Sequence, residues 1–202
     1  INVKKRNCSV EPLDLEKMHV MVEQSCKGLA GVSASQIEMN SGIQFYDGIS
    51  TAEIQEILIK SSNDLITLTN PNYQFVAARL LLFALRKSLY GYYFDTPKLL
   101  EHIKKCVNDG VYDKEVLTNY TDEEINEIEN FLDHDRDFLF TYAGLRQVVD
   151  KYLVQDRSSG AIYETPQFMY VLISMTIFAK YPKETRLSYV PVSYTHLRAH
   201  ET

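Results

Sequence analysis

The stretch VKKRNCSVEPLDLEK, from Val3 to Lys17, decides how the chain begins to fold. Apolar and basic residues alternate before Asn7, a turn follows, and SVEPL extends again, so the pattern predicts a β-hairpin. Asp14 then stands where a helix N-cap is expected, and apolar residues recur behind it at helical spacing as far as Gly28. The opening of the chain is therefore predicted to be a two-stranded hairpin that runs directly into a helix.

Three further helices are expected in this half of the chain. The second covers roughly Ala34–Tyr46. A capping box formed by Ser50 and Glu53 begins the third. The dipeptide Asn70-Pro71 opens the fourth, which is apolar nearly all round, as in a buried helix, and ends near Gly91. The hairpin should thus cap a small cluster of four helices.

The remaining sequence predicts more helices and a second hairpin. Thr121 and Glu124 form another capping box, which begins an acidic helix that runs through NFLDHDRDF. Lys151–Glu164 reads as a hairpin with a glycine in its turn. Thr165-Pro166 then begins an apolar helix, which a later proline ends.

These patterns together predict a mainly α protein in two parts. Residues 1–90 would form the domain of four helices capped by a β-hairpin. Residues 91–190 would form a helical segment with one further β-hairpin. No internal repeat and no low-complexity linker separates the two parts.

The charged residues are distributed unevenly. The net charge of the 202-residue chain is −6, yet residues 1–90 carry nine basic and nine acidic side chains, so the acidic excess lies in residues 91–202. Nucleic-acid-binding proteins usually present a broad basic surface, so no nucleic-acid partner is expected. The basic cluster at the start of the chain is local and suits a small polyanion instead.

Neither a membrane span nor a signal peptide is expected. The longest apolar stretches, FVAARLLLFAL and VLISMTIFA, are too short to cross a bilayer. Cys8, Cys26 and Cys106 show no CxxC spacing. This favours a reducing, cytoplasmic location and argues against a structural zinc site.

A small set of polar residues could hold a polyphosphate. Binding a triphosphate requires several converging cations and the N–H groups of a helix N-terminus. The candidates are Lys5, Arg6, Lys17 and Lys87 for charge, with Thr51 and Gln55 on one face at the start of the third helix. The alternative is that these bases are solvated surface residues.

Other groups of polar residues are weaker candidates for a binding or catalytic site. HDRD, His134 to Asp137, mixes a possible metal ligand with carboxylates, but a salt-bridged surface face is the commoner explanation for such a pattern. The chain contains no Walker loop, Rossmann glycine pattern, GxSxG or HExxH motif. No catalytic residue and no metal ligand is therefore expected.

Longer segments resemble a known family. VKKRN…VEPLDLEKM, IQFYDGISTAEI and YQFVAARLLLFALRKSLYG are similar to the ATP-cone of class Ia ribonucleoside-diphosphate reductase large (alpha) subunits. FLDHDRDFLFTYAGLRQVVDKYLVQDRSSGAIYETPQFMYVLIS and FAKYPKETRLSYV resemble the helical segment that follows the cone. The resemblance covers about residues 1–190 and implies an N-terminal fragment with an allosteric ATP-cone domain.

The resemblance implies a role for each matching residue. Lys5, Arg6, Thr51 and Lys87 would meet the phosphates of ATP or dATP, bound together with Mg²⁺. The segment that leads from strand to helix would enclose the base and the sugar, and its members are Glu11, Pro12, Leu13, Asp14, Leu15, Glu16 and Lys17. The last of these would also contact phosphate.

Three positions depart from the family pattern. Gln55 stands where a histidine or an acid usually touches the sugar or base, and Asp14 stands where asparagine is frequent. Cys8 replaces a usual turn glycine, so the turn is strained if that position requires positive φ. These departures keep an alternative open, in which the cone is degenerate and the chain is a structural helical module that only contacts other subunits.

The resemblance also implies an activity for the complete protein. The family reduces ribonucleoside diphosphates to deoxyribonucleotides, and ATP and dATP compete for the cone to control overall activity. Its partners are a radical-carrying small (beta) subunit and a second large subunit in a homodimer. The family's radical cysteine, redox cysteine pair and barrel lie beyond the end of this chain. We therefore expect the chain to hold no redox cofactor and to be inactive alone.

Residues 191–202, PVSYTHLRAHET, depart from the family pattern. Pro191 is expected to interrupt the preceding helix. The segment resembles a translated sequencing-adapter tail, so we expect it to be non-native and leave it out of the predicted fold.

Overall fold

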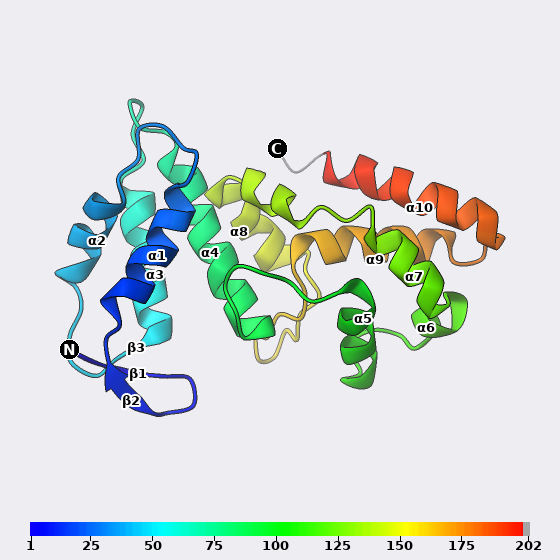
Figure 1. Ribbon diagram of the computed structural model, residues 1–202, viewed down its shortest axis with the longest axis horizontal. Helices are drawn as coiled ribbons and strands as arrows, with labels where there is room; N and C mark the ends of the chain where they lie inside the picture. Colours follow the sequence, from blue (N-terminus) through cyan, green and yellow to red (C-terminus); the bar gives the residue numbers. More distant parts are fainter. Residues whose placement is uncertain (200–202) are drawn as a thin grey trace.

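A small three-stranded sheet forms one end of the molecule in the computed structural model, which describes residues 1–199 (Figure 1). The predicted hairpin is confirmed, because β1 (Asn2–Lys4) pairs antiparallel with β2 (Val10–Pro12). A third strand, β3 (Ile49–Ser50), pairs parallel with the other edge of β1 and gives the order β2-β1-β3. A strand of two residues carries no alternation, so β3 had no sequence signal.

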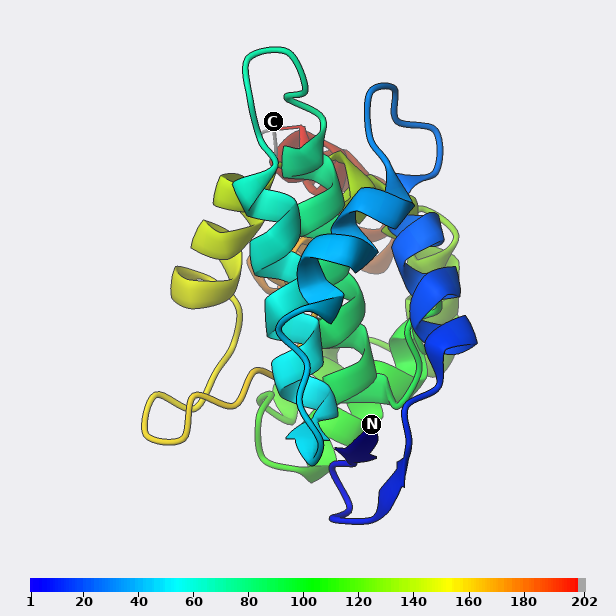
Figure 2. The same cartoon turned by 90° about the vertical axis from the view of Figure 1, so that its left-hand side faces the viewer.

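Four helices pack behind this sheet. They are α1 (Leu15–Cys26), α2 (Ala34–Gly42), α3 (Thr51–Asp64) and α4 (Tyr73–Tyr90). Figure 2 looks onto this end and shows α1, α2 and α3 in front of α4. The prediction of a mainly α fold with four helices behind a hairpin is confirmed. The second helix is shorter than expected, since the chain turns before Tyr46.

Local caps fix the ends of these helices. Asp14 accepts a hydrogen bond from the backbone N–H of Lys17 at 2.9 Å, and Ser50 and Glu53 form both bonds of the predicted capping box. Gly91 ends α4 at φ +84°, a left-handed conformation that favours glycine. The fourth helix begins two residues later than its predicted proline, because a turn precedes it.

Seven helical elements follow within residues 91–199. They are α5 (Leu99–Asn108), α6 (Glu115–Asn119), α7 (Asp122–Glu129), the 3₁₀ helix η1 (His134–Leu139), α8 (Tyr142–Lys151), α9 (Pro166–Phe178) and α10 (Lys183–Arg198). The predicted acidic helix is divided, because the side chain of Asp133 accepts from the N–H of Asp135 at 3.2 Å and caps η1 separately. Among residues 1–199, no helix combines the length and the apolar character that a membrane span needs.

The predicted second hairpin is present in a short form. Lys151 ends α8, and the chain then pairs antiparallel through one bridge, between Gln155 and Ile162. Backbone hydrogen bonds from the N–H of Asp156 to Ala161 O at 2.8 Å and from the N–H of Tyr163 to Val154 O at 3.0 Å flank this bridge. The turn itself is present, because the Asp156 carboxylate accepts the N–H of Ser158 at 2.9 Å. The sequence signal therefore identified the turn, and the strand pairing around it is limited to this one bridge.

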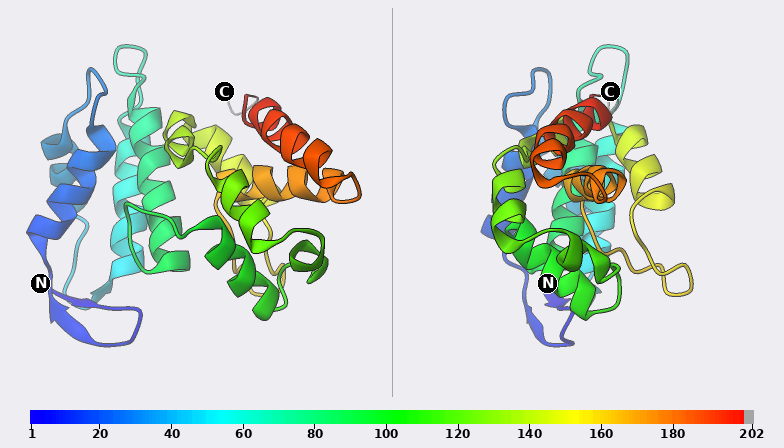
Figure 3. Two further views of the ribbon diagram at one scale, coloured as in Figure 1. Left: turned by 45° about the vertical axis from the view of Figure 1, so that its right-hand side comes forward. Right: turned by 90° about the vertical axis from the view of Figure 1, so that its right-hand side faces the viewer.

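Two hydrophobic cores run through the molecule. The first joins the sheet and the first four helices, with Val3 and Leu58 at its centre, to Phe140 and to Met169 of α9. The second lies between α5, α7, α9 and α10, around Phe168. α4 contacts α1 and α3 as well as α8 and η1, so it lies between the two parts of the molecule (Figure 3). A domain boundary at residue 90 remains a prediction, since the first core includes residues from both sides of it.

The last helix continues through Pro191, so the expected interruption is not observed. Val190 and Tyr194, on either side of the proline, are buried in the second core, and this packing stabilises the helix across it. The non-native origin of residues 191–202 remains a prediction. The last three of them, 200–202, lie outside the described residues.

Candidate functional site

A cavity of about 370 Å³ lies beneath the hairpin, between α1, α3 and α4. Three of the twelve residues expected at the site, Pro12, Leu15 and Glu16, do not line it, and Leu15 is 62% exposed. The other nine do line it: Lys5, Arg6, Glu11, Leu13, Asp14, Lys17, Thr51, Gln55 and Lys87. The fold therefore brings most of the candidates, from distant parts of the chain, to one cavity.

Four cationic side chains converge on the cavity from three structural elements. Lys5 and Arg6 follow β1, Lys17 lies in the first turn of α1, and Lys87 lies in the last turn of α4. Burial lowers the pKa of Lys87, and the positive charges of Lys17, Arg6 and Lys5 lower it further. Because like charges disfavour the charged form, an anion in the cavity would relieve this repulsion.

An aromatic ring faces two of these cations. Lys87 Nζ lies 5.3 Å and Lys17 Nζ 6.0 Å from the ring centroid of Tyr93, which also lines the cavity. Lys87 Nζ donates a hydrogen bond to the carbonyl oxygen of Gly91 at 2.6 Å. Tyr93 was not among the predicted site residues, because its position depends on the path that the chain takes after the end of α4.

Two carboxylates share the wall with the bases. Glu11 Oε2 lies 3.4 Å from Lys5 Nζ, across the hairpin. Asp14 Oδ1 accepts the backbone N–H of Lys17 at 2.9 Å and so serves as the cap of α1. Both acids therefore already contact the elements that carry the bases, and they help to position them.

Part of the cavity lining is apolar. The apolar lining residues are Val3, Met18, Met21 and Ile54, together with Leu13 from the predicted set. The spacing of the two methionines along α1 is helical, which is a signal for a buried face but not for a ligand. These side chains offer an uncharged surface in the same cavity as the bases.

Gln55 lines the cavity next to Met21. Its side chain is 7% exposed, and Nε2 donates to Met21 Sδ at 3.3 Å. Thr51 lies one turn earlier and is the first residue of α3, so the N-terminal end of that helix opens onto the cavity. The capping box occupies the backbone N–H groups of Ser50 and Glu53. Thr51 is thus the residue of this helix end that faces the cavity.

Cys8 occupies a left-handed turn at the tip of the hairpin. It is exposed, and its φ of +66° is the one positive value outside glycine among residues 1–199. The turn closes with two backbone hydrogen bonds, from the N–H of Cys8 to Lys5 O at 2.9 Å and from the N–H of Lys5 to Ser9 O at 2.8 Å. The position that the family usually fills with glycine therefore does require positive φ, and the turn is strained.

The HDRD segment differs from its interpretation as a surface face. Asp137 is 1% exposed, and its Oδ2 lies 3.9 Å from Nη2 of Arg86, which is equally buried. The interpretation fails for Asp137 because the segment forms a 3₁₀ helix that directs this carboxylate inward. Within residues 1–199, no cluster of three potential metal-ligating side chains is present.

Two family models match this chain, one in its first part and one in its last part. Residues 1–88 match the ATP cone domain, and residues 138–201 match the all-alpha domain of ribonucleotide reductase. The chain is 48% identical to the ribonucleoside-diphosphate reductase 1 subunit alpha of Escherichia coli (strain K12) and 48% identical to the subunit alpha of Haemophilus influenzae. It is 41% identical to the subunit alpha of Enterobacteria phage T4.

These alignments cover nearly the whole chain but a small part of each relative. They include 95% of this chain for the two bacterial proteins, 94% for the phage protein, and 25% of each relative. The chain thus spans about a quarter of the length of the curated relatives that it matches. An ATP cone followed by the all-alpha domain, with this identity, places the chain in the family of ribonucleoside-diphosphate reductase alpha subunits.

Proposed function

We propose that the cavity beneath the hairpin binds ATP or dATP and that this binding regulates ribonucleotide reduction by the complete protein. The observation that carries the proposal is the convergence of four cations on a cavity that also has apolar lining residues. The bases would hold the phosphates, as charge-assisted hydrogen bonds do at other polyphosphate sites. The wall formed around Met18 and Met21 would contact the base and the sugar.

Magnesium fits this site as a companion of the phosphates. Asp14 Oδ1 is occupied by the cap of α1, and Glu11 lies against Lys5, so neither carboxylate is set aside for a metal. Mg²⁺ keeps several waters and commonly binds through substrate phosphates. The residues present therefore favour an ion that arrives on the nucleotide and touches the protein at Glu11 at most.

Calorimetric titration of ATP and of dATP into the 202-residue chain tests the proposal. Lys87→Ala and Thr51→Ala should each weaken binding, because each removes a contact to phosphate. A charge-assisted hydrogen bond contributes about 1.5–3 kcal/mol, so the loss at Lys87 should be about tenfold to a hundredfold in Kd. Lys60→Ala, at an exposed position of α3, is the control and should bind as the unaltered chain does. Equal affinity in all three variants would refute the site.

A structural module without ligand is the second candidate, and two observations favour it. Gln55 is turned toward Met21, and Cys8 strains the hairpin that covers the cavity. A ligand that binds only the folded state must raise the melting temperature as its concentration rises. A thermal titration with millimolar ATP or dATP and magnesium separates the candidates, since the structural module predicts a constant melting temperature.

In the complete protein, the proposed regulation acts on reduction of ribonucleoside diphosphates, with a radical-carrying small subunit and a second large subunit as partners. The chain alone should not catalyse this reaction. Burial raises the pKa of both Cys26 and Cys106 to about 11, so these thiols stay protonated at neutral pH and are poor candidates for redox chemistry. A reductase assay with added small subunit should show no turnover, and turnover by the chain would contradict this expectation.

A further inference from the structure

Arg86 is a buried cation that is held by long contacts. Its side chain is 2% exposed, Nη2 lies 3.9 Å from Asp137 Oδ2, and the same atom donates to the carbonyl oxygen of His134 at 3.4 Å. Nε has no hydrogen-bond partner within residues 1–199. The guanidinium stands 5.3 Å from the ring centroid of Phe138. Guanidinium–carboxylate pairs usually make short, parallel hydrogen bonds, so this cation is weakly satisfied for its burial.

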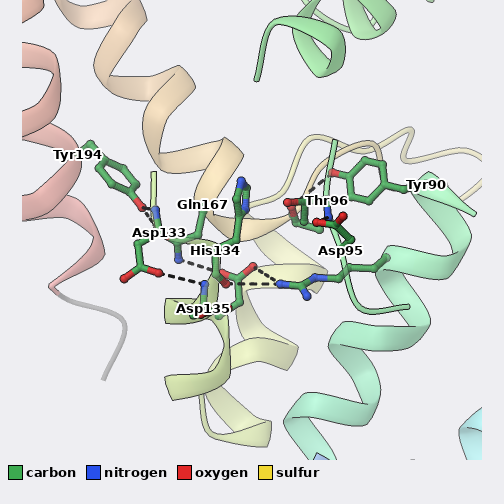
Figure 4. A network of polar contacts seen from close by, with 11 residues as sticks. Tyr90, Asp95, Thr96, Asp133, His134, Asp135, Gln167 and Tyr194 are labelled. Carbon is green, nitrogen blue, oxygen red and sulfur yellow. Dashed lines mark hydrogen bonds and ion pairs between the residues drawn. The ribbon is translucent and has the colours of Figure 1, made fainter. Parts of the chain in front are cut away.

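The contacts of Arg86 lead from α4 into the second half of the fold. Asp137 belongs to η1, and its Oδ1 accepts a hydrogen bond from Nε2 of Gln167, on α9, at 2.8 Å. Gln167 is fully buried. Figure 4 shows Gln167 and His134 within this network. Arg86, Asp137 and Gln167, which we call the buried polar chain, therefore connect three elements through the interior of the protein.

The buried polar chain begins next to the cavity. Arg86 precedes Lys87, and successive side chains of an α-helix point about 100° apart. At the end of α4, Lys87 therefore faces the cavity and Arg86 faces η1. Because the two residues share the backbone of this turn, a displacement of the turn moves both side chains. Moving Arg86 away from Asp137 would separate two buried opposite charges, which is unfavourable. Such a contact is expected to switch between discrete arrangements and not to slide gradually.

We propose that the buried polar chain transmits occupancy of the cavity from α4 to η1 and α9, an inference that rests on the nucleotide-binding function proposed above. Lys87 Nζ donates a hydrogen bond to Gly91 O at the end of α4. A phosphate that attracts this ammonium repositions the last turn of the helix. Arg86 then changes its contact with Asp137, and η1 responds.

Hydrogen–deuterium exchange of the 202-residue chain, with and without saturating ATP, tests the transmission. Allosteric coupling of ordinary size predicts about a fivefold or larger change in the exchange rates of residues 133–140, in addition to a change around the cavity. A double variant, Arg86→Met with Asp137→Asn, removes both charges at once and so leaves neither isolated in the core. It should retain the change at the cavity and lose the change at residues 133–140.

Arg146→Met is the matched control. Arg146 belongs to α8, which also packs on α4, but its guanidinium pairs with Asp150 at the surface, at 2.7 Å. This variant should respond to ATP at residues 133–140 as the unaltered chain does. Loss of the response in both Arg146→Met and the double variant would overturn the specific role of the buried polar chain.

The remaining outcomes separate the transmission from nucleotide binding itself. A change around the cavity without one at residues 133–140 overturns the transmission and leaves the binding function intact. A response at residues 133–140 that persists in the double variant overturns the roles of Arg86 and Asp137. No change anywhere overturns both proposals. The first comparison uses the unaltered chain, so it decides the question even if the double variant does not fold.

Discussion

Raising the pH should weaken nucleotide binding and, at the same time, stabilise the unliganded chain. Both effects arise at Lys87, whose pKa is lowered by burial and by the charges of Lys17, Arg6 and Lys5. A bound polyphosphate would replace repulsion by attraction and raise this pKa. Binding should therefore take up a proton at any pH between the pKa of the empty site and the pKa of the occupied site.

The size of the effect follows from the proton count. With one proton taken up, affinity falls about tenfold, or about 1.4 kcal/mol, for each pH unit above the pKa of the empty site. The free energy of unfolding of the unliganded chain depends on pH in the opposite direction. The unfolded chain restores the ordinary pKa of lysine, so in the window between the folded and the unfolded pKa it binds the proton that the folded chain has lost. The free energy of unfolding therefore rises with pH across that window.

Calorimetry at alkaline pH, where the triphosphate itself is fully ionised, measures the proton uptake. Titrations in two buffers of different ionisation enthalpy should give different apparent enthalpies for the unaltered chain and for Lys60→Met, the exposed control on α3. Lys87→Met should remove most of the difference. Urea unfolding without nucleotide, over the same pH range, measures the rise in stability.

Two results would refute this reasoning. One is proton release on binding, which would place the titrating group elsewhere. The other is equal proton uptake by Lys87→Met and by the unaltered chain, which would show that the ammonium of Lys87 does not meet the phosphates.

Three further predictions concern stability and ionisation. Cys8→Gly should raise the free energy of unfolding by about 1 kcal/mol in a urea titration, because relief of left-handed strain exceeds the added freedom of the unfolded chain; no gain would mean that the turn is relaxed. Glu124→Ala should lower it by about 3–5 kcal/mol, since the Glu124 carboxylate, which is 3% exposed, binds Arg186 through both oxygens at 2.7–3.0 Å; a loss below about 1 kcal/mol would contradict this. Glu38→Gln should lower the pKa of His19, which the hydrogen bond and charge of Glu38 raise; an unchanged NMR titration would contradict the 2.7 Å contact.

Local signals in the sequence predicted the elements whose ends are fixed by neighbouring residues. Asp14 caps α1, Ser50 and Glu53 form their capping box, and Gly91 ends α4, because each of these contacts spans four residues or fewer. The second capping box is different. Thr121 accepts the N–H of Glu124 as expected, but the carboxylate of that residue turns to an arginine of α10, and no local pattern reveals a partner so distant in sequence.

Some residues of the candidate site could likewise be predicted from the sequence, and others could not. The bases could be chosen from residue type and family resemblance, since a polyphosphate needs cations whatever the fold. Val3 and Met21 carry the signal of ordinary core residues, and Tyr93 lies in a connecting segment, so their place on the wall emerges only from packing. The burial of Asp137 was missed for the same reason, because a polar segment with both charges suggests a surface until its partner, Arg86, is seen.

The central position of β1 has a consequence for synthesis. Translation delivers this strand and its hairpin partner before β3 and the end of α4, which follow much later in the chain. A two-stranded hairpin is at best marginally stable in water. A nascent chain that has not yet emerged beyond Lys87 therefore carries its N-terminal bases without an assembled cavity around them. The proposed nucleotide binding should therefore become possible late, as one event, when α4 has left the ribosome.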